Sequence, residues 1–332
     1  MNDPGRLPDF FLIGAPKCGT TSLHRYLGQH PGLYMSPIKE PHFFADEVRV
    51  RNFDPTMKAK AVARATGLRS WLDGPTRRSV SGGPIETRAD YISLFRDAGP
   101  FRQAGESSTC YLWSPTAPRN IAEHVPHARI LAVLRNPIDR AFSQYAHMLS
   151  FARTPITFRE YVDSALESRS SVFSEIYPFL NFGLYGGQLA RWLQYFPRER
   201  IHVALYDDFK RDPATFMRTI FRFLGVDAAF RPDFSRRYME ARVPRSANAG
   251  RMLRIPGFVA LARRMPRKLR SALRPLVYRP RRAMQMEPKD RERLVEWYRS
   301  DLYRLSRLLG QDFSGWLDPE SDHKSVACTL RA

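Results

Sequence analysis

The chain has 332 residues, 43% of them apolar, which is enough for a packed core and excludes a largely disordered protein. No apolar run approaches the roughly 20 residues of a membrane span, no signal-peptide pattern opens the chain, and three cysteines give no disulfide framework. The cysteine usage favours a reducing, cytoplasmic setting. Lys and Arg outnumber Asp and Glu by 53 to 33, a formal net charge of +20, so we expect anionic partners.

Three short apolar runs predict buried strands, and each is followed by a stretch with the apolar spacing of a helix. The strands are expected at 9–14 (DFFLIG), 129–134 (RILAVL) and 200–206 (RIHVALY), with helices beginning near Thr20, Pro137 and Asp212. Strands that alternate with helices indicate a parallel sheet between helices. We therefore predict an α/β fold with a three-layer, doubly wound parallel sheet.

Two other stretches have a distinct character. Residues 45–100 show no regular pattern, and we interpret them as an insertion or lid, because long loops in compact domains usually serve a function. Residues 287–310 have strong helical spacing, and their aromatic residues, Trp297 and Tyr298 among them, are expected in the core. We predict one domain over 1–320 and a flexible tail at 321–332.

The positive charge is uneven along the chain. Between Ala241 and Met286 there is no acidic residue, against thirteen Arg or Lys. Three interpretations are open: a solvated surface, a groove for an acidic glycan, and short amphipathic segments that touch an anionic membrane surface. The last would place the protein peripherally at the inner face of the membrane.

The residues between the first strand and its helix, GAPKCGTTS, predict an anion-binding loop. Gly14 and Gly19 have the separation of the nucleotide-triphosphatase loop, but Thr20 stands where that loop has lysine, and Lys17 lies inside it. Backbone N–H groups at a helix N-terminus can converge on an anion, and nearby hydroxyls add donors. The candidate anion-binding residues are Lys17, Cys18, Gly19, Thr20, Thr21 and Ser22. The alternative is a glycine turn that only joins strand to helix.

These residues resemble a known family. PKCGTTSL after a strand resembles the 5′-phosphosulfate loop of sulfotransferases that use 3′-phosphoadenosine 5′-phosphosulfate (PAPS), and LRNPIDRAFSQY is similar to their 3′-phosphate motif. KEPHFF resembles the segment that carries the catalytic carboxylate in the heparan-sulfate and related bacterial branch, whose course GESSTCYL also follows. The resemblance extends from about residue 9 to Trp316 and implies the P-loop-like sulfotransferase fold.

The resemblance also implies a reaction and its residues. A sulfuryl group would pass from PAPS to a hydroxyl, or alternatively an amine, of a carbohydrate-containing or lipid-linked acceptor, releasing adenosine 3′,5′-bisphosphate. Glu40 is expected as the base, with His42 as a rival base or acceptor-orienting group, and Lys17 as the clamp on the leaving 5′-phosphate. The 3′-phosphate is assigned to Arg135, Ser143 and, from the loop after residue 242, Arg245. No metal is expected, because the donor has no triphosphate and His42 lacks companions at ligand spacing.

The chain departs from the pattern of the heparan-sulfate branch at two positions, so the acceptor is not identified. The chain has Ala45 and Ser107 where the heparan-sulfate branch often has an acidic residue and a lysine, so the resemblance does not identify a heparan-type acceptor. Arg119, Arg140 and Arg153 are interpreted either as neighbours of the site or as surface cations.

Two other functions were weighed. A nucleotide kinase would need the lysine after Gly19 and an acidic strand end for Mg²⁺. A nucleic-acid-binding protein fits the charge, but the sequence has no recognised module for it, so no nucleic acid is expected.

Overall fold

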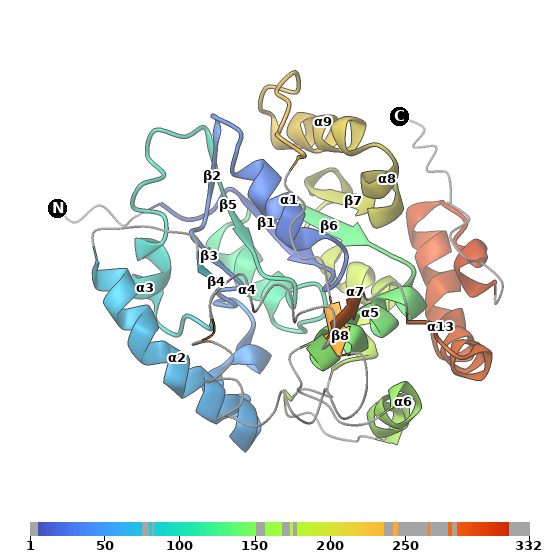
Figure 1. Cartoon of the computed structure of the whole chain (residues 1–332). Coiled ribbons are helices and arrows are strands. Elements are labelled where there is room, and N and C mark those ends of the chain that lie inside the picture. The colour runs from blue at the N-terminus through green and yellow to red at the C-terminus, as the bar shows by residue number, and fades with distance from the viewer. Residues whose placement is uncertain are drawn as a thin grey trace.

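A five-stranded parallel sheet forms the centre of the computed structural model, which describes residues 6–74, 80–81, 83–150, 157–167, 173–174, 178–235, 242–244, 265, 278–280 and 284–318. The strand order is β2-β5-β1-β6-β7, and every neighbouring pair is parallel. The strands are β1 Phe10–Gly14, β2 Leu33–Met35, β5 Gln103–Ser107, β6 Arg129–Leu134 and β7 Ile201–Leu205. Helices flank the sheet on both faces (Figure 1), so the predicted three-layer α/β fold is confirmed.

The helices follow the chain around this sheet. They are α1 Thr20–Leu27, α2 Pro55–Asp73, α3 Arg88–Ser93, α4 Ala117–His124, α5 Pro137–Ser150, α6 Phe158–Glu167, α7 Tyr185–Trp192, α8 Tyr206–Arg211, α9 Pro213–Leu224 and α13 Pro288–Leu309. Two short strand pairs lie outside the sheet: parallel β3 Ile38–Lys39 with β4 Val80–Ser81, and antiparallel β8 Arg242–Pro244 with β9 Tyr278–Pro280. In Figure 1, α2 and α13 lie on opposite sides of the molecule.

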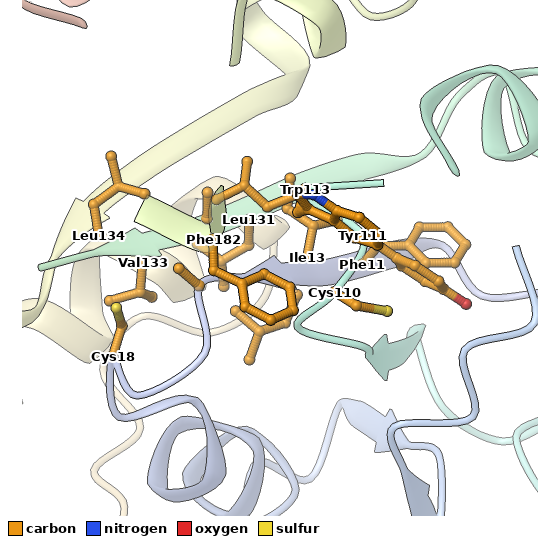
Figure 2. Packing of buried hydrophobic residues seen from close by; sticks show 14 of the residues in the cluster. Phe11, Ile13, Cys18, Cys110, Tyr111, Trp113, Leu131, Val133, Leu134 and Phe182 are labelled. Atoms are coloured by element: carbon orange, nitrogen blue, oxygen red, sulfur yellow. The ribbon is translucent and has the colours of Figure 1, made fainter. Parts of the chain in front are cut away.

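The predicted strands and helices are found where the apolar runs place them. Strands β1 and β6 are buried along almost their whole length, as expected for the interior of a parallel sheet. Figure 2 shows their side chains in one cluster, with Cys18 at one end beside Val133 and Leu134, and Tyr111 toward the other. The core therefore reaches directly under the loop that follows β1.

The stretch 45–100 is more regular than the sequence indicated. It contains the 19-residue helix α2 and the shorter α3. Helix α2 has no clear apolar stripe, which is why periodicity missed it, but Asp54 caps it by accepting hydrogen bonds from the N–H groups of Thr56 and Met57. An aspartate followed by Pro55 is a helix-start signal, and it was the one available clue.

One smaller expectation was wrong, and one strand was not predicted. Trp297 is 38% exposed, whereas Tyr298 beside it is fully buried, so only one of these aromatic residues belongs to the core. Strand β5 was not predicted, because its sequence QAGES has no apolar run. It nevertheless lies between β2 and β1, where Gly105 is crossed by the ring of Phe10 and leaves no room for a Cβ atom.

Part of the basic segment can be placed. Strand β8 packs against α5 and pairs with β9, but most of 241–286, including Arg245, lies outside the described residues, as do Arg153 and the predicted tail. Among the helices that the structure describes, none combines the length and apolar character needed to cross a bilayer.

Candidate active site

The loop after β1 and the residues after β6 lie at the same edge of the sheet. The two strands are parallel neighbours, and the N–H of Ala15 donates to the carbonyl of Val133 at 2.8 Å. Tyr206, which begins α8, joins them: a Cβ atom on Gly19 would lie 2.8 Å from its ring, and the Arg135 guanidinium lies 5.2 Å from its ring centroid. The structure thus brings together two of the predicted anion-binding segments.

The loop has the backbone of an anion cradle. Lys17 and Gly19 have φ values of 70° and 78°, and Gly19 caps α1 without any side-chain hydrogen bond. No acidic residue occupies the first turn of α1, so its N-terminal N–H groups face no carboxylate from that turn. Thr20 is buried, and Thr21 and Ser22 are partly exposed beside it. This donor set, with a lysine inside it, suits a phosphate or sulfate group.

Cys18 is a packing residue within this loop. Its side chain is fully buried, and its N–H donates to the carbonyl of Ala15 at 3.3 Å. Burial raises the pKa of the thiol to about 11, although Arg135 and Arg140 pull it down. The thiol is therefore neutral and unreactive at ordinary pH.

The residues after β6 include two candidate 3′-phosphate ligands and one structural arginine. Arg135 is mostly buried, 3.9 Å from Asp139 in a loose ion pair, and Ser143 is buried one helical turn further along α5. Arg140 is not a surface cation: it is fully buried and donates to Gln144 and to the carbonyl of Phe179, both at 2.6 Å. Arg119, in contrast, is an exposed residue of α4 paired with Glu123.

Glu40 follows β3 and is held by an extensive set of donors. The N–H of Thr109 donates to Oε2 at 2.7 Å, its hydroxyl lies 3.1 Å from Oε1, and Lys39 forms a short ion pair with Oε1. Burial acts to raise the pKa of Glu40, but Lys39, His42 and Thr109 together hold it below its ordinary value. The carboxylate is thus ionised at neutral pH, and its side chain keeps 23% exposure, which lets a ligand reach it.

His42 faces a thiol as well as Glu40. Its Nδ1 lies 2.9 Å from Cys110 Sγ and 3.8 Å from Glu40 Oε2. Burial lowers the pKa of His42 despite the Glu40 carboxylate, and burial raises the pKa of Cys110 well above its ordinary value. A neutral thiol that donates to Nδ1 leaves the imidazole proton on Nε2. His42 then offers a donor to a ligand, which favours orientation over proton abstraction.

Ser107 connects Glu40 to the helix that starts at the anion loop. Its carbonyl accepts from the N–H of Glu40 at 2.8 Å, and its hydroxyl lies 2.9 Å from Nδ1 of His24 on α1. Burial and the nearby Lys39 and Arg25 lower the pKa of His24 to about 3, so this histidine is neutral and structural. The Glu40 segment and the anion loop are therefore parts of one assembly.

All three predicted catalytic residues share a backbone feature. Among the described residues, Lys17, Glu40 and His42 are the non-glycine residues with positive φ, at 70°, 65° and 58°. Such conformations are unfavourable by about 1–3 kcal/mol each and concentrate at functional sites. Glu40 also precedes Pro41, and a residue before proline prefers extended backbone. The surrounding hydrogen bonds hold these residues in place.

Sequence reasoning missed several contributors. Lys39, Thr109 and Tyr206 contact the candidate residues, yet no spacing pattern links them to those residues. The only sequence signal for Lys39 was that it directly precedes Glu40. In the part of the chain that the structure describes, no group of three or more His, Cys, Asp or Glu side chains is placed to hold a metal ion.

The family model and the curated relatives that match this chain all point to one family. A family model for the sulfotransferase domain matches residues 7–242. The human bifunctional heparan sulfate N-deacetylase/N-sulfotransferase 2 is 27% identical over 330 residues, covering 97% of this chain and 32% of its own length. Rat carbohydrate sulfotransferase 15 is 28% identical over 271 residues, covering 66% of this chain and 44% of its own. The chain thus spans about a third to under a half of these two curated relatives.

A solved structure supports the same grouping. The sulfotransferase from Alicyclobacillus acidocaldarius has a TM-score of 0.67 and 29% sequence identity, and the match covers 94% of this chain and all of that one.

Proposed function

Because this chain belongs to the sulfotransferase domain family and is a sulfotransferase, we propose that its donor is PAPS and its acceptor a hydroxyl of a carbohydrate-containing molecule. The observation that carries the proposal is the placement of Arg135 beside the Lys17–Ser22 loop, with Tyr206 against both. Two cationic sites at one sheet edge suit a ligand with separated 5′ and 3′ anionic groups. The names of the curated relatives support a carbohydrate acceptor.

The described residues can share the reaction between them. The Lys17 ammonium and the loop N–H groups would hold the 5′-phosphate, where charge increases as its bond to sulfur breaks. The acceptor oxygen forms the new bond to sulfur, and its proton passes to Glu40. Through its Nε2 proton, His42 would orient the acceptor. Arg135 and Ser143 would hold the 3′-phosphate.

Ligand binding and transfer test the proposal directly. Adenosine 3′,5′-bisphosphate at a hundred times its Kd should stabilise the protein by about 2.7 kcal/mol. ATP with Mg²⁺ and duplex DNA serve as comparison ligands for the kinase and nucleic-acid alternatives. Transfer of labelled sulfate from PAPS to a panel of glycans, glycolipids, amino sugars and phenols would then identify the acceptor. Stabilisation by ATP with Mg²⁺ and not by the bisphosphate would contradict the donor assignment.

Arg135→Ala should weaken bisphosphate binding by more than ten-fold, on the order of 1.4 kcal/mol or above, because a charge-assisted contact is lost. Isothermal calorimetry measures the change directly. Arg307→Ala, which removes an exposed arginine of α13, is the matched control and should bind normally. Equal affinities for the wild type and Arg135→Ala would remove Arg135 from the 3′-phosphate site.

Lys39→Met should move the acid limb of the kcat/KM profile to higher pH. Lys39 helps to hold the pKa of Glu40 below its ordinary value, so its removal lets that pKa rise and protonates the base at a higher pH. The loss is greatest at acidic pH and fades as pH rises. Lys289→Met, an exposed lysine of α13, should leave the profile in place. An acid limb that does not move in Lys39→Met would show that Lys39 has no influence on the titrating group.

A further inference from the structure

Glu106 is a buried carboxyl that the proposed reaction does not use. It lies on β5 opposite Phe11 of β1 and is fully buried. Its partners Tyr91 and Tyr111 both pack against the ring of Phe44. Burial raises its pKa to about 7, against hydrogen bonds that lower it. Among the described residues no cation forms an ion pair with Glu106. A carboxyl in such a place is unfavourable unless its hydrogen bonds serve a purpose.

Three hydroxyl groups donate to this carboxyl. Ser108 Oγ lies 2.5 Å from Oε1, while the hydroxyls of Tyr91 and Tyr111 lie 2.5 Å and 3.3 Å from Oε2. A hydroxyl has a single proton, and an ionised carboxylate can only accept. When Glu106 is ionised, each hydroxyl therefore directs its proton at Glu106 and keeps its lone pairs for other donors.

Two of the three hydroxyls accept backbone N–H groups from residues 42–44, which directly follow Glu40 and Pro41. Ser108 Oγ accepts the N–H of His42 at 3.0 Å, and Tyr111 accepts the N–H of Phe44 at 3.1 Å. Tyr91 donates to Glu106 but accepts no N–H from this segment in the part of the chain that the structure describes. Glu106 is thus linked to the backbone of residues 42–44 by two chains of hydrogen bonds, one through Ser108 and one through Tyr111.

The segment needs such support. Glu40 and His42 both have positive φ, a conformation that neither side chain favours, and Pro41 between them has no N–H to donate. Without fixed acceptors for the N–H groups of His42 and Phe44, the segment would relax toward extended backbone. That relaxation would move the Glu40 carboxylate away from an acceptor hydroxyl.

We propose that Glu106 is a positioning residue that, through the hydroxyls of Ser108 and Tyr111, fixes the backbone from which Glu40 and His42 act. The inference rests on the proposed role of Glu40 as the base. Glu106 touches neither donor nor acceptor, so its effect should fall on turnover and spare the donor site.

A matched pair of tyrosine variants tests the inference. Both Tyr111→Phe and Tyr91→Phe remove one hydroxyl from the same carboxyl oxygen and keep the ring, but only Tyr111→Phe deprives a segment N–H of its acceptor. We expect kcat to fall about ten-fold or more in Tyr111→Phe, since small displacements of a reacting group have large effects, and about two-fold in Tyr91→Phe. Bisphosphate affinity should stay within about two-fold in both. Turnover is compared from about pH 7 to about pH 9, because burial raises the pKa of Glu106 to about 7 and each variant loses a hydrogen bond that lowers it.

Glu106→Gln completes the test. In Glu106→Gln the side-chain NH₂ donates to one of the hydroxyls, so that hydroxyl can no longer donate to residue 106. Its lone pairs are then shared between the amide and the backbone N–H of His42 or Phe44. We expect kcat to fall about ten-fold or more, with bisphosphate binding retained. Suppose that Glu40→Gln is inactive, as the proposed function requires. Equal losses of kcat in Tyr111→Phe and Tyr91→Phe, or full turnover in Glu106→Gln, would then overturn the inference about Glu106 and leave the proposed function standing. An active Glu40→Gln would instead refute the base assignment, and the inference with it.

Discussion

Glu40→Gln is expected to lower kcat by roughly 10²- to 10⁴-fold, the usual effect of removing a general base. The glutamine amide keeps the size of the side chain and can still accept from the N–H of Thr109, but it cannot take the acceptor proton. Bisphosphate affinity should be almost unchanged, because the proposed role of Glu40 is on the acceptor and not on the donor. Steady-state transfer from PAPS, with calorimetry of the bisphosphate on the same preparation, measures both quantities.

His42→Ala is the comparison variant for this result. If His42 orients the acceptor through Nε2, its removal should raise the KM for the acceptor more than it lowers kcat. If His42→Ala lost turnover while Glu40→Gln stayed active, His42 would be the base and Glu40 the residue that orients the acceptor. When the Cys110 thiol donates to His42 Nδ1, the imidazole proton lies on Nε2, and that outcome is then unexpected.

Lys17→Met should lower kcat by about 10²- to 10³-fold, as the loss of one donor to developing charge does elsewhere. Methionine keeps much of the length of the side chain and removes only the ammonium. In the proposed site the loop N–H groups would also hold the ground-state 5′-phosphate, so bisphosphate affinity should fall less than turnover.

Lys289→Met controls for the loss of one positive charge from a protein of net charge +20. Lys17→Arg is a second comparison, because it restores charge with a different geometry. Retention of most turnover in Lys17→Met would mean that the loop N–H groups alone stabilise the leaving phosphate.

Local residue patterns determined the framework of the fold. Strands β1, β6 and β7 are short apolar runs followed by helix starts, and this alternation is typical of a parallel sheet with helices on both faces. Strand β5 escaped prediction because QAGES is neither apolar nor alternating. Its position is decided by neighbours, since Gly105 is the residue that lets the Phe10 ring cross the strand.

The candidate site divides in the same way. The sequence alone determined the anion loop, because Gly14, Lys17 and Gly19 sit within six residues, and the resemblance to a family supplied Arg135, Ser143 and Glu40. Only the tertiary structure decided what surrounds them. Thr109, Tyr206 and Glu106 reach the site from separate strands and loops, where no sequence spacing connects them. Protonation followed the same rule: the states of His42 and Glu106 depend on burial and on partners that folding brings within 3.5 Å, so residue type alone could not fix them.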